Sequence, residues 1–145
     1  MRCTSWLDVK GVLRAVKQES IDPLQKAALM VEREAKRSMK AGGKFKSASG
    51  EMVGIPSAPG SPPHVQSGNL RASITHAMTV LATWIVGPTA VAWYGQIHEF
   101  GGHYGGKWFP PRPFMWPALL KVAPLFPALF RNLPLSRHKT RGPAE

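Results

Sequence analysis

The segment HEFGGH, residues 98–103, holds the side chains whose types and spacing come closest to a catalytic motif. In zinc metalloproteases two histidines four positions apart lie on one face of a helix, and the glutamate between them acts as general base. Here His98 and His103 are five positions apart, which is about 500° around a helix and therefore roughly 140° out of alignment. The two glycines between them also disfavour a helix. The spacing argues against a zinc protease, and only a loop could bring both imidazoles to one metal ion.

Signatures of other enzyme classes are not found in the sequence. There is no G-x-S-x-G elbow for a nucleophilic serine and no glycine-rich phosphate-binding motif. Glu99 is nearly alone in its region, so paired carboxylates are hard to assemble around it. Cys3 is the only cysteine, which excludes an intrachain disulfide and cysteine-based zinc sites. We therefore predict no catalytic residue, no cofactor and no metal site. The enzymatic alternative is a metal-dependent hydrolase that uses His98, Glu99 and His103.

The chain is strongly basic at both ends. It has 145 residues, enough for one domain with a hydrophobic core, and a formal charge of +11 from 19 basic and 8 acidic residues. Residues 1–46 hold 11 of the basic and 5 of the acidic residues, residues 107–145 hold 7 and 1, and residues 47–106 are nearly neutral. Such a surface suits a phosphate backbone, an acidic protein or an anionic membrane. The alternative is a solvated face that aids solubility.

Candidate contacts with DNA or with an acidic partner lie in these two basic segments. No zinc finger, homeodomain or RNA-binding aromatic motif accompanies them. Any contact with nucleic acid is therefore expected to be electrostatic and independent of base sequence. The candidate contact residues are Lys36, Arg37, Lys40, Lys44, Lys46, Arg137, Lys139 and Arg141.

The clearest predicted helix covers residues 22–41, where alanine, leucine and valine recur on one face. Asp22 can cap its N-terminus, and Pro23 suits the first turn because its missing N–H would be unpaired there. Gly42-Gly43 is expected to end the helix. Upstream, residues 6–18 predict a short strand or extended entry followed by a short helix.

The middle of the chain predicts a long loop followed by a hairpin. Residues 43–66 contain four prolines, four glycines and four serines, and a loop of this length is functional or disordered. Residues 67–74 predict a capped helical turn that leads into a strand. The β-branched and aromatic residues of 73–80 and 83–87 predict a hairpin or part of a meander. Residues 91–100 fit a strand or a short helix.

Prolines dominate the C-terminal region. Pro113 and Pro117 hold the chain extended until a helix can begin near Pro117. Pro124 and Pro127 remove backbone donors, at about 3 kcal/mol each in a helix interior. The C-terminal helix is therefore expected to kink or stop there.

These elements together predict an α+β fold: an N-terminal helix or helices, a small antiparallel sheet, and a C-terminal helix interrupted by prolines. We expect one domain over residues 1–131, with the extended loop 43–66, and a basic C-terminal tail over residues 132–145. The N-terminus lacks the apolar run of a signal peptide, and no uninterrupted apolar run reaches membrane-spanning length.

Three segments stand in a recognisable order: PGSPPHVQSGNLRASI (59–74), VGPTAVAWYGQIHEFGG (86–102) and PPRPFMWPAL (110–119). The ordered set resembles the small tail-completion or neck (head–tail joining) proteins of long-tailed double-stranded-DNA bacteriophages. That family's pattern is a proline-rich approach, a T/S-G-x-L-x-x-S-I turn, a V-G segment, a tyrosine shortly before E-F-G, and R-P-F-x-x-P-A-L opening a C-terminal helix. No single piece is specific. The matching residues are Ser67, Gly68, Leu70, Arg71, Ser73, Ile74, Val86, Gly87, Tyr94, Glu99, Phe100, Gly101, Arg112, Pro113, Phe114, Pro117, Ala118 and Leu119.

The resemblance implies structural rather than catalytic roles for its residues. Phe100, Phe114 and Trp116 are expected to anchor the core or an interface. Glu99 lies beside aromatic residues in an acid-poor region and is expected to pair with Arg112, whose planar guanidinium binds a carboxylate at two points; a simple exposed glutamate is the alternative. The candidate structural or interface residues are Gly68, Leu70, Arg71, Glu99, Phe100, Gly101, Arg112, Pro113, Phe114 and Pro117.

The function that the resemblance implies is that of a virion component at the head–tail junction. Such proteins form rings, often six-fold, around the DNA channel, so we expect a homo-oligomeric ring of six copies. The expected partners are the head-closure or connector protein, the tail terminator, the tail tube and, in the channel, double-stranded DNA, with no membrane. Assembly would take place in the cytoplasm of the bacterial host. Loop 43–66 and the basic tail would order on neighbouring subunits.

Two further functions stay open at this point. One is the tail terminator of the same junction. The other is a basic protein that binds nucleic acid without sequence preference, whose binding would weaken steeply with salt.

Overall fold

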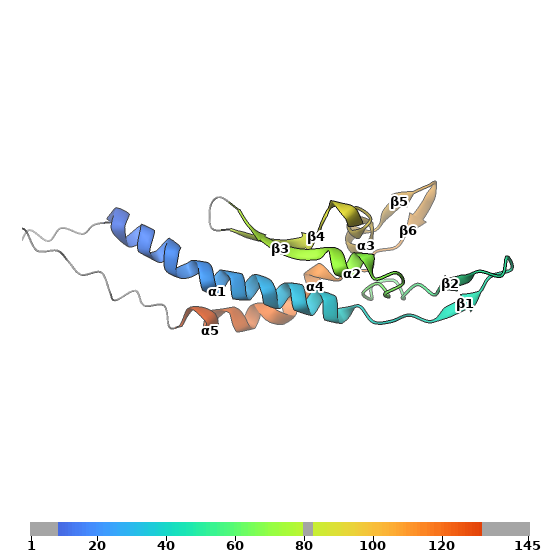
Figure 1. The fold of residues 1–145 in the computed structure, drawn as a ribbon, viewed down its shortest axis with the longest axis horizontal. Coiled ribbons are helices and arrows are strands. Elements are labelled where there is room, and N and C mark those ends of the chain that lie inside the picture. The colour runs from blue at the N-terminus through green and yellow to red at the C-terminus, as the bar shows by residue number, and fades with distance from the viewer. Residues whose placement is uncertain (1–8, 80–82, 132–145) are drawn as a thin grey trace, which may run out of the picture.

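The computed structural model describes residues 9–79 and 83–131 and shows a mixed α+β fold built along one long helix (Figure 1). The predicted fold class is confirmed. In chain order the elements are α1 (Val9–Ser38), β1 (Lys44–Lys46), β2 (Met52–Gly54), α2 (Asn69–Ser73), β3 (Ile74–Met78), β4 (Trp84–Pro88), the 3₁₀ helix η1 (Ala90–Ala92), α3 (Gly95–Phe100), β5 (Gly102–Tyr104), β6 (Lys107–Phe109), α4 (Met115–Val122), the 3₁₀ helix η2 (Ala123–Leu125) and α5 (Phe126–Phe130).

Helix α1 runs for 30 residues and passes through Pro23 without a break. The predicted cap at Asp22 is therefore wrong. Of the segment 6–18, the predicted short helix is present but belongs to α1, the strand or extended entry expected before it is helical from Val9, and residues 6–8 lie outside the described residues. Proline adopts the helical φ, but it lacks a backbone donor and its ring crowds the carbonyl four residues earlier, which together cost about 3 kcal/mol in a helix interior. The ring of Pro23 is buried, and burial of apolar surface offsets part of that loss.

The C-terminal end of α1 comes three residues earlier than predicted, at Ser38. Beyond it the backbone pairs with a distant segment: the Val65 N–H donates to the Lys40 carbonyl at 2.8 Å, and Ala41 forms a parallel bridge with Val65. At Gly42 an added Cβ would lie 2.7 Å from the Cβ of His64. Gly42 therefore permits a close approach of two chain segments rather than capping the helix.

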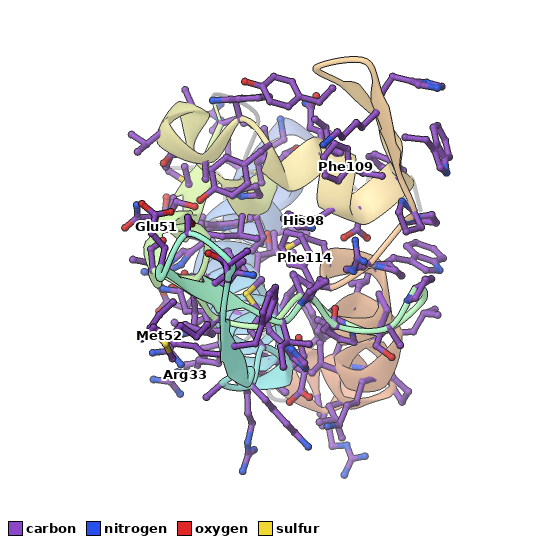
Figure 2. The ribbon with its side chains drawn as sticks, turned by 90° about the vertical axis from the view of Figure 1, so that its right-hand side faces the viewer. Arg33, Glu51, Met52, His98, Phe109 and Phe114 are labelled. Atoms are coloured by element: carbon purple, nitrogen blue, oxygen red, sulfur yellow. The ribbon has the colours of Figure 1, made fainter. Side chains whose placement is uncertain are left out.

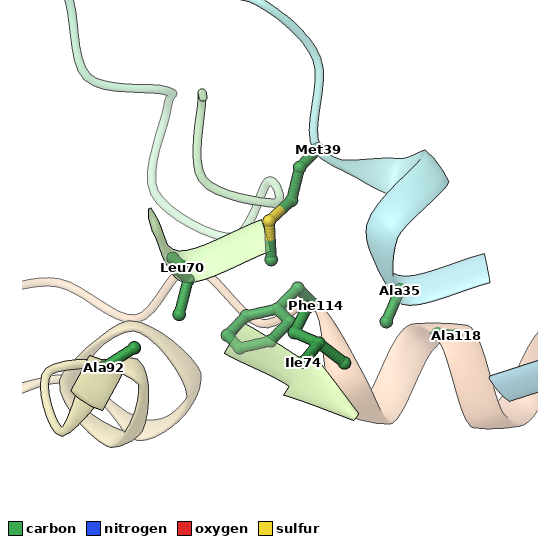
Figure 3. Close-up of a cluster of buried hydrophobic side chains, with 7 residues drawn as sticks. All are labelled: Ala35, Met39, Leu70, Ile74, Ala92, Phe114 and Ala118. Atoms are coloured by element: carbon green, nitrogen blue, oxygen red, sulfur yellow. The ribbon is translucent and has the colours of Figure 1, made fainter. Parts of the chain in front are cut away.

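The core is small and lies where α1, β3, η1 and α4 meet (Figure 3). Phe114 and Ile74 are the largest side chains that are fully buried. Alanines line the contact between α1 and α4, and small side chains let two helices approach closely. The core cluster consists of Ala35, Met39, Leu70, Ile74, Ala92, Phe114 and Ala118.

The predicted hairpin is present as β3–β4, which is antiparallel with Ile74 opposite Pro88 and Met78 opposite Trp84. The predicted helical turn before it is α2. The hairpin packs along one side of α1, and α4 and α5 pack along another (Figure 1). Residues 91–100, which fitted a strand or a helix, form the end of η1 and the helix α3.

Loop 43–66 contains regular structure that its composition did not predict. Strands β1 and β2 form an antiparallel hairpin that extends beyond the end of α1 (Figure 1). Backbone bonds from Ser47 and Gly50 close its turn. All four prolines of the segment come after the hairpin, in residues 56–63, and the first part of the segment has the phenylalanine and valine typical of a short strand.

The C-terminal helical region changes character at its prolines. Helix α4 ends at Val122, and Pro124 and Pro127 stand at the first positions of η2 and α5. Proline is tolerated there because the first N–H groups of a helix have no partner inside it. The predicted tail, residues 132–145, lies outside the described residues. Among the residues described, no helix combines the length and apolarity needed to cross a bilayer.

Candidate functional site

The carboxylate of Glu99 caps the N-terminus of α4. Its Oε2 accepts hydrogen bonds from the backbone N–H groups of Phe114 (2.9 Å) and Met115 (3.0 Å), and its Oε1 accepts one from Trp116 (2.9 Å). The first N–H groups of a helix lack internal partners and carry partial positive charge. Glu99 therefore accepts hydrogen bonds from three of these N–H groups, although it precedes Phe114 by 15 residues in the chain.

Arg112 has different partners from the one that the sequence suggested. Its Nε donates to the Ser57 carbonyl at 2.8 Å, and its backbone N–H donates to the His98 carbonyl at 2.6 Å. The predicted pair of Glu99 with Arg112 is therefore wrong, because both oxygens of the carboxylate are directed at backbone amides. Arg112 instead joins the proline-rich middle of loop 43–66 to the residues that precede α4, where the Gly60 N–H also donates to the Pro111 carbonyl at 2.8 Å.

Gly101 makes the turn between α3 and β5. Its φ is 74°, in the left-handed region, and its N–H donates to the Ile97 carbonyl at 2.9 Å, which closes the end of α3. A Cβ at this position would lie 3.1 Å from the Phe109 carbonyl oxygen. Both the conformation and the close approach therefore require glycine. The E-F-G tripeptide therefore forms the turn at the end of α3.

The two phenylalanines predicted as anchors lie in different environments. Phe114 is fully buried at the centre of the molecule (Figure 2). Phe100 is 79% exposed, and Trp116 is 61% exposed. Phe114 is thus a core residue, whereas Phe100 and Trp116 remain available to a neighbouring molecule.

The remaining candidate residues lie at the starts of α2 and α4. Gly68, with φ 86°, precedes α2, whose Leu70 belongs to the core cluster while Arg71 is exposed. Pro113 leads into α4, and Pro117 lies in its first turn. The structure therefore brings all three motif segments into contact: Glu99 of the second caps α4 of the third, Gly60 of the first donates to Pro111 of the third, and Thr89 of the second donates to Ser73 of the first.

An apolar groove of about 730 Å³ runs between α1, β4, α3 and α4. Leu24 and Val31 line it from α1, Trp84 from β4, and the exposed Phe100 and Trp116 from α3 and α4. Sequence reasoning missed this groove, because its walls are contributed by segments that are distant in the chain. The signal available in the sequence was the number of aromatic residues between positions 84 and 116.

Comparison with family models, with curated proteins and with solved structures gave no match. The function must therefore be inferred from the residues and geometry of this chain.

The histidines of the HEFGGH segment lie in separate surroundings. The ring of His98 packs edge-on against Tyr94, with centroids 6.0 Å apart, and that of His103 lies 4.9 Å from Trp108. Burial lowers the pKa of His98, and the charge of Arg112 lowers it further. In residues 9–79 and 83–131 no three His, Cys, Asp or Glu side chains are grouped as metal ligands.

Two acidic side chains in the C-terminal half of α1 are bound within the subunit. Glu32 accepts hydrogen bonds from Lys36 at 2.6 Å and from His76 on β3 at 2.5 Å. Burial acts to raise the pKa of Glu32, but these two hydrogen bonds outweigh it and hold the pKa below its usual value. Glu34 pairs with Lys121 of α4 at 2.5 Å. These contacts fasten both flanks of α1 to the elements beside it.

The predicted basic contact residues differ in their availability. Lys36 is engaged with Glu32 and is only partly exposed. Arg37, Lys40, Lys44 and Lys46 are exposed. The last three candidates lie outside the described residues: Arg137, Lys139 and Arg141.

Proposed function

We propose that this chain is a structural protein of the head–tail junction of a long-tailed double-stranded-DNA bacteriophage, where copies of it form a ring that completes the tail around the DNA channel. The observation that carries the proposal is the convergence of the three motif segments. Glu99 of the second segment caps the helix that the third segment opens. Leu70 of the first segment shares a core cluster with Phe114 of the third. Because the three segments contact one another in the folded chain, they form one structural unit. This spatial contact supports the resemblance in addition to the order of the motifs in the sequence.

Exposed apolar surface supports assembly with other copies. Large apolar patches on a protein surface mark interaction sites. The groove between α1, β4, α3 and α4 is open to solvent, and Phe100 and Trp116 are exposed along it. Elsewhere the β1–β2 and β5–β6 hairpins expose Phe45, Met52 and Trp108. A closed ring requires two different surfaces on each copy, and the chain offers apolar side chains in both regions.

The use of the polar motif residues supports a structural role. Glu99 is the acid of the HEFGGH segment, and both of its oxygens accept from backbone amides. A carboxylate held in this way stabilises a helix terminus and is poorly placed to remove a proton from a substrate. Arg112 likewise binds backbone carbonyls within the chain.

Deletion of the coding sequence from the phage that carries it tests the proposal. We expect filled heads and separate tails that are not joined, and we expect the purified protein to restore joined, infectious particles when added to the mixture. Tails of uncontrolled length would instead indicate the tail terminator of the same junction. Normal joined virions in the absence of the chain would overturn the proposal.

A further inference from the structure

A row of exposed cations follows the outer side of α1 and continues past its end. Between residues 26 and 40 every exposed side chain is a lysine or an arginine. The three cations on α1 are Lys26, Arg33 and Arg37. Their spacings of seven and four residues place them within about 40° of one another around the helix and about 17 Å apart from first to last. We call this row the basic stripe; its members are Lys26, Arg33, Arg37, Lys40, Lys44 and Lys46.

The three stripe residues on α1, Lys26, Arg33 and Arg37, lie opposite the core side of that helix. Ala28, Val31 and Ala35 are buried against the body of the molecule. Viewed along the long axis, Arg33 lies at the periphery and Phe114 at the centre (Figure 2). The stripe is therefore separate from the apolar groove, which α1 lines with its inner side.

No acidic residue in this part of α1 is free to neutralise the stripe. Residues 26–46 contain two acids, Glu32 and Glu34. Their side chains are 13% and 14% exposed, and they are bound by Lys36 and His76 and by Lys121, respectively. The nearest other acid on α1 is Asp22, which is exposed one turn before Lys26. Most of the charge of the stripe is therefore left for a partner outside the subunit.

The composition of the stripe favours a nucleic acid over a protein partner. Protein–protein interfaces have an apolar centre with few charged residues, whereas the exposed side chains between residues 26 and 40 are cations alone. Duplex DNA carries about one negative charge per 1.7 Å of axis, so the part of the stripe on α1, about 17 Å long, can meet phosphates along its whole length. Lysines and arginines on a helix face, in a chain with a pI of about 10.4, form the electrostatic footprint of nucleic-acid binding.

We infer that the basic stripe binds the phosphate backbone of double-stranded DNA without reading its sequence. DNA binding by the stripe does not require the proposed ring. Only the location of the stripe on the inner surface of a ring rests on the proposed function. Phosphate contacts position a protein on the duplex and carry no direct sequence information, which suits a channel through which DNA of any sequence passes.

Fluorescence anisotropy with two labelled 30-base-pair duplexes of unrelated sequence tests the inference, between 50 and 200 mM NaCl. The test variant is Lys26→Gln/Arg33→Gln/Arg37→Gln. The matched control, Lys17→Gln/Arg71→Gln/Lys107→Gln, removes the same charge from exposed cations elsewhere. We expect the test variant to bind both duplexes at least ten-fold more weakly than the wild type, with a salt slope smaller by about one for each phosphate that the variant no longer neutralises. The control should stay within about three-fold of the wild type.

Equal losses of affinity for the two variants would overturn the inference, since binding would then follow bulk charge. It would also be overturned by polyglutamate competing as well as unlabelled duplex at equal charge, which would indicate an acidic protein partner. Circular dichroism of both variants controls for folding, and sedimentation of the same samples reports the ring. Rings without DNA binding would contradict the inference alone, whereas DNA binding without rings would contradict the proposed function alone.

Discussion

At the scale of single residues, Glu99 has a structural role that its motif did not suggest. An ion pair with Arg112 was the natural expectation for an isolated acid near an arginine. The capping contacts to three amides of α4 could not be predicted, because the residue spacing does not reveal that α3 ends beside the start of α4. The glycine that follows was easier to interpret, since E-F-G implies a turn and Gly101 has a positive φ.

Replacing Glu99 with glutamine should destabilise the fold. Glutamine keeps one acceptor oxygen but loses the charge that interacts with the helix terminus, and hydrogen bonds to charged groups contribute more than neutral ones. We expect the free energy of unfolding of Glu99→Gln to fall by about 2 kcal/mol, measured by urea denaturation. Glu51→Gln, on the exposed tip of the β1–β2 hairpin, is the matched control. Equal effects of the two substitutions would contradict the capping role.

Gly101 offers a second comparison at this scale. Gly101→Ala forces a side chain into the left-handed region, at about 1–2 kcal/mol, and places its Cβ 3.1 Å from a backbone carbonyl. Gly105 also has positive φ, at 56°, but a Cβ there meets nothing within 4 Å. Thermal unfolding should therefore show a clearly larger loss of stability for Gly101→Ala than for Gly105→Ala. A larger loss for the Gly105 variant would show that close approach is unimportant at the corner.

At the scale of elements, the sequence predicted correctly those helices and strands that depend on neighbouring residues. The β3–β4 hairpin followed from β-branched residues on both sides of a turn, and the helical turn of α2 followed from its cap sequence. The predicted start of α1 was wrong because the cost of Pro23 in the helix interior, about 3 kcal/mol, is offset in part by burial of its ring, which the local sequence does not reveal. The β1–β2 hairpin was missed because each of its strands has only three residues, and the proline content of the whole segment 43–66 indicated a loop.

The contact of α1 with β3 through Glu32 gives this part of the fold a pH dependence. The pKa of Glu32 lies below its ordinary value of 4.5. The contact therefore stabilises the folded state above that ordinary value, and the contribution is lost as the pH falls through the lower folded pKa. We expect Glu32→Gln to be less stable than the wild type at pH 6 and the difference to shrink toward pH 3, measured by denaturant unfolding. A difference that stays constant over this range would contradict the assignment; Glu19→Gln, on an exposed part of α1, is the control.

At the scale of the whole molecule, two kinds of surface lie on different sides of α1. The inner side lines the apolar groove, and the outer side carries the basic stripe. The charge asymmetry was visible in the sequence, but the groove was not, since it needs α1, β4, α3 and α4 in place. Apolar contacts between subunits and a cationic surface toward a polyanion are the two requirements of a ring around DNA.

A substitution in the groove should affect assembly more than folding. Phe100 is 79% exposed, so Phe100→Ser removes little buried area from the subunit and should change its thermal stability only slightly. If the groove contacts a neighbouring copy, the same change should shift the sedimentation profile from assembled to smaller species. Val91→Ser, at a residue 81% exposed and outside the groove, is the matched control. A Phe100 variant that assembles like the control would exclude the groove from the interface.

The location of the chain in the virion is the most direct test of its proposed role. Electron cryomicroscopy of virions that carry a tagged copy of the chain should show the tag in a single ring, with a central channel, between the portal and the tail tube. A tag found only outside virions, or spread along the tail or the capsid, would contradict the assignment to the head–tail junction.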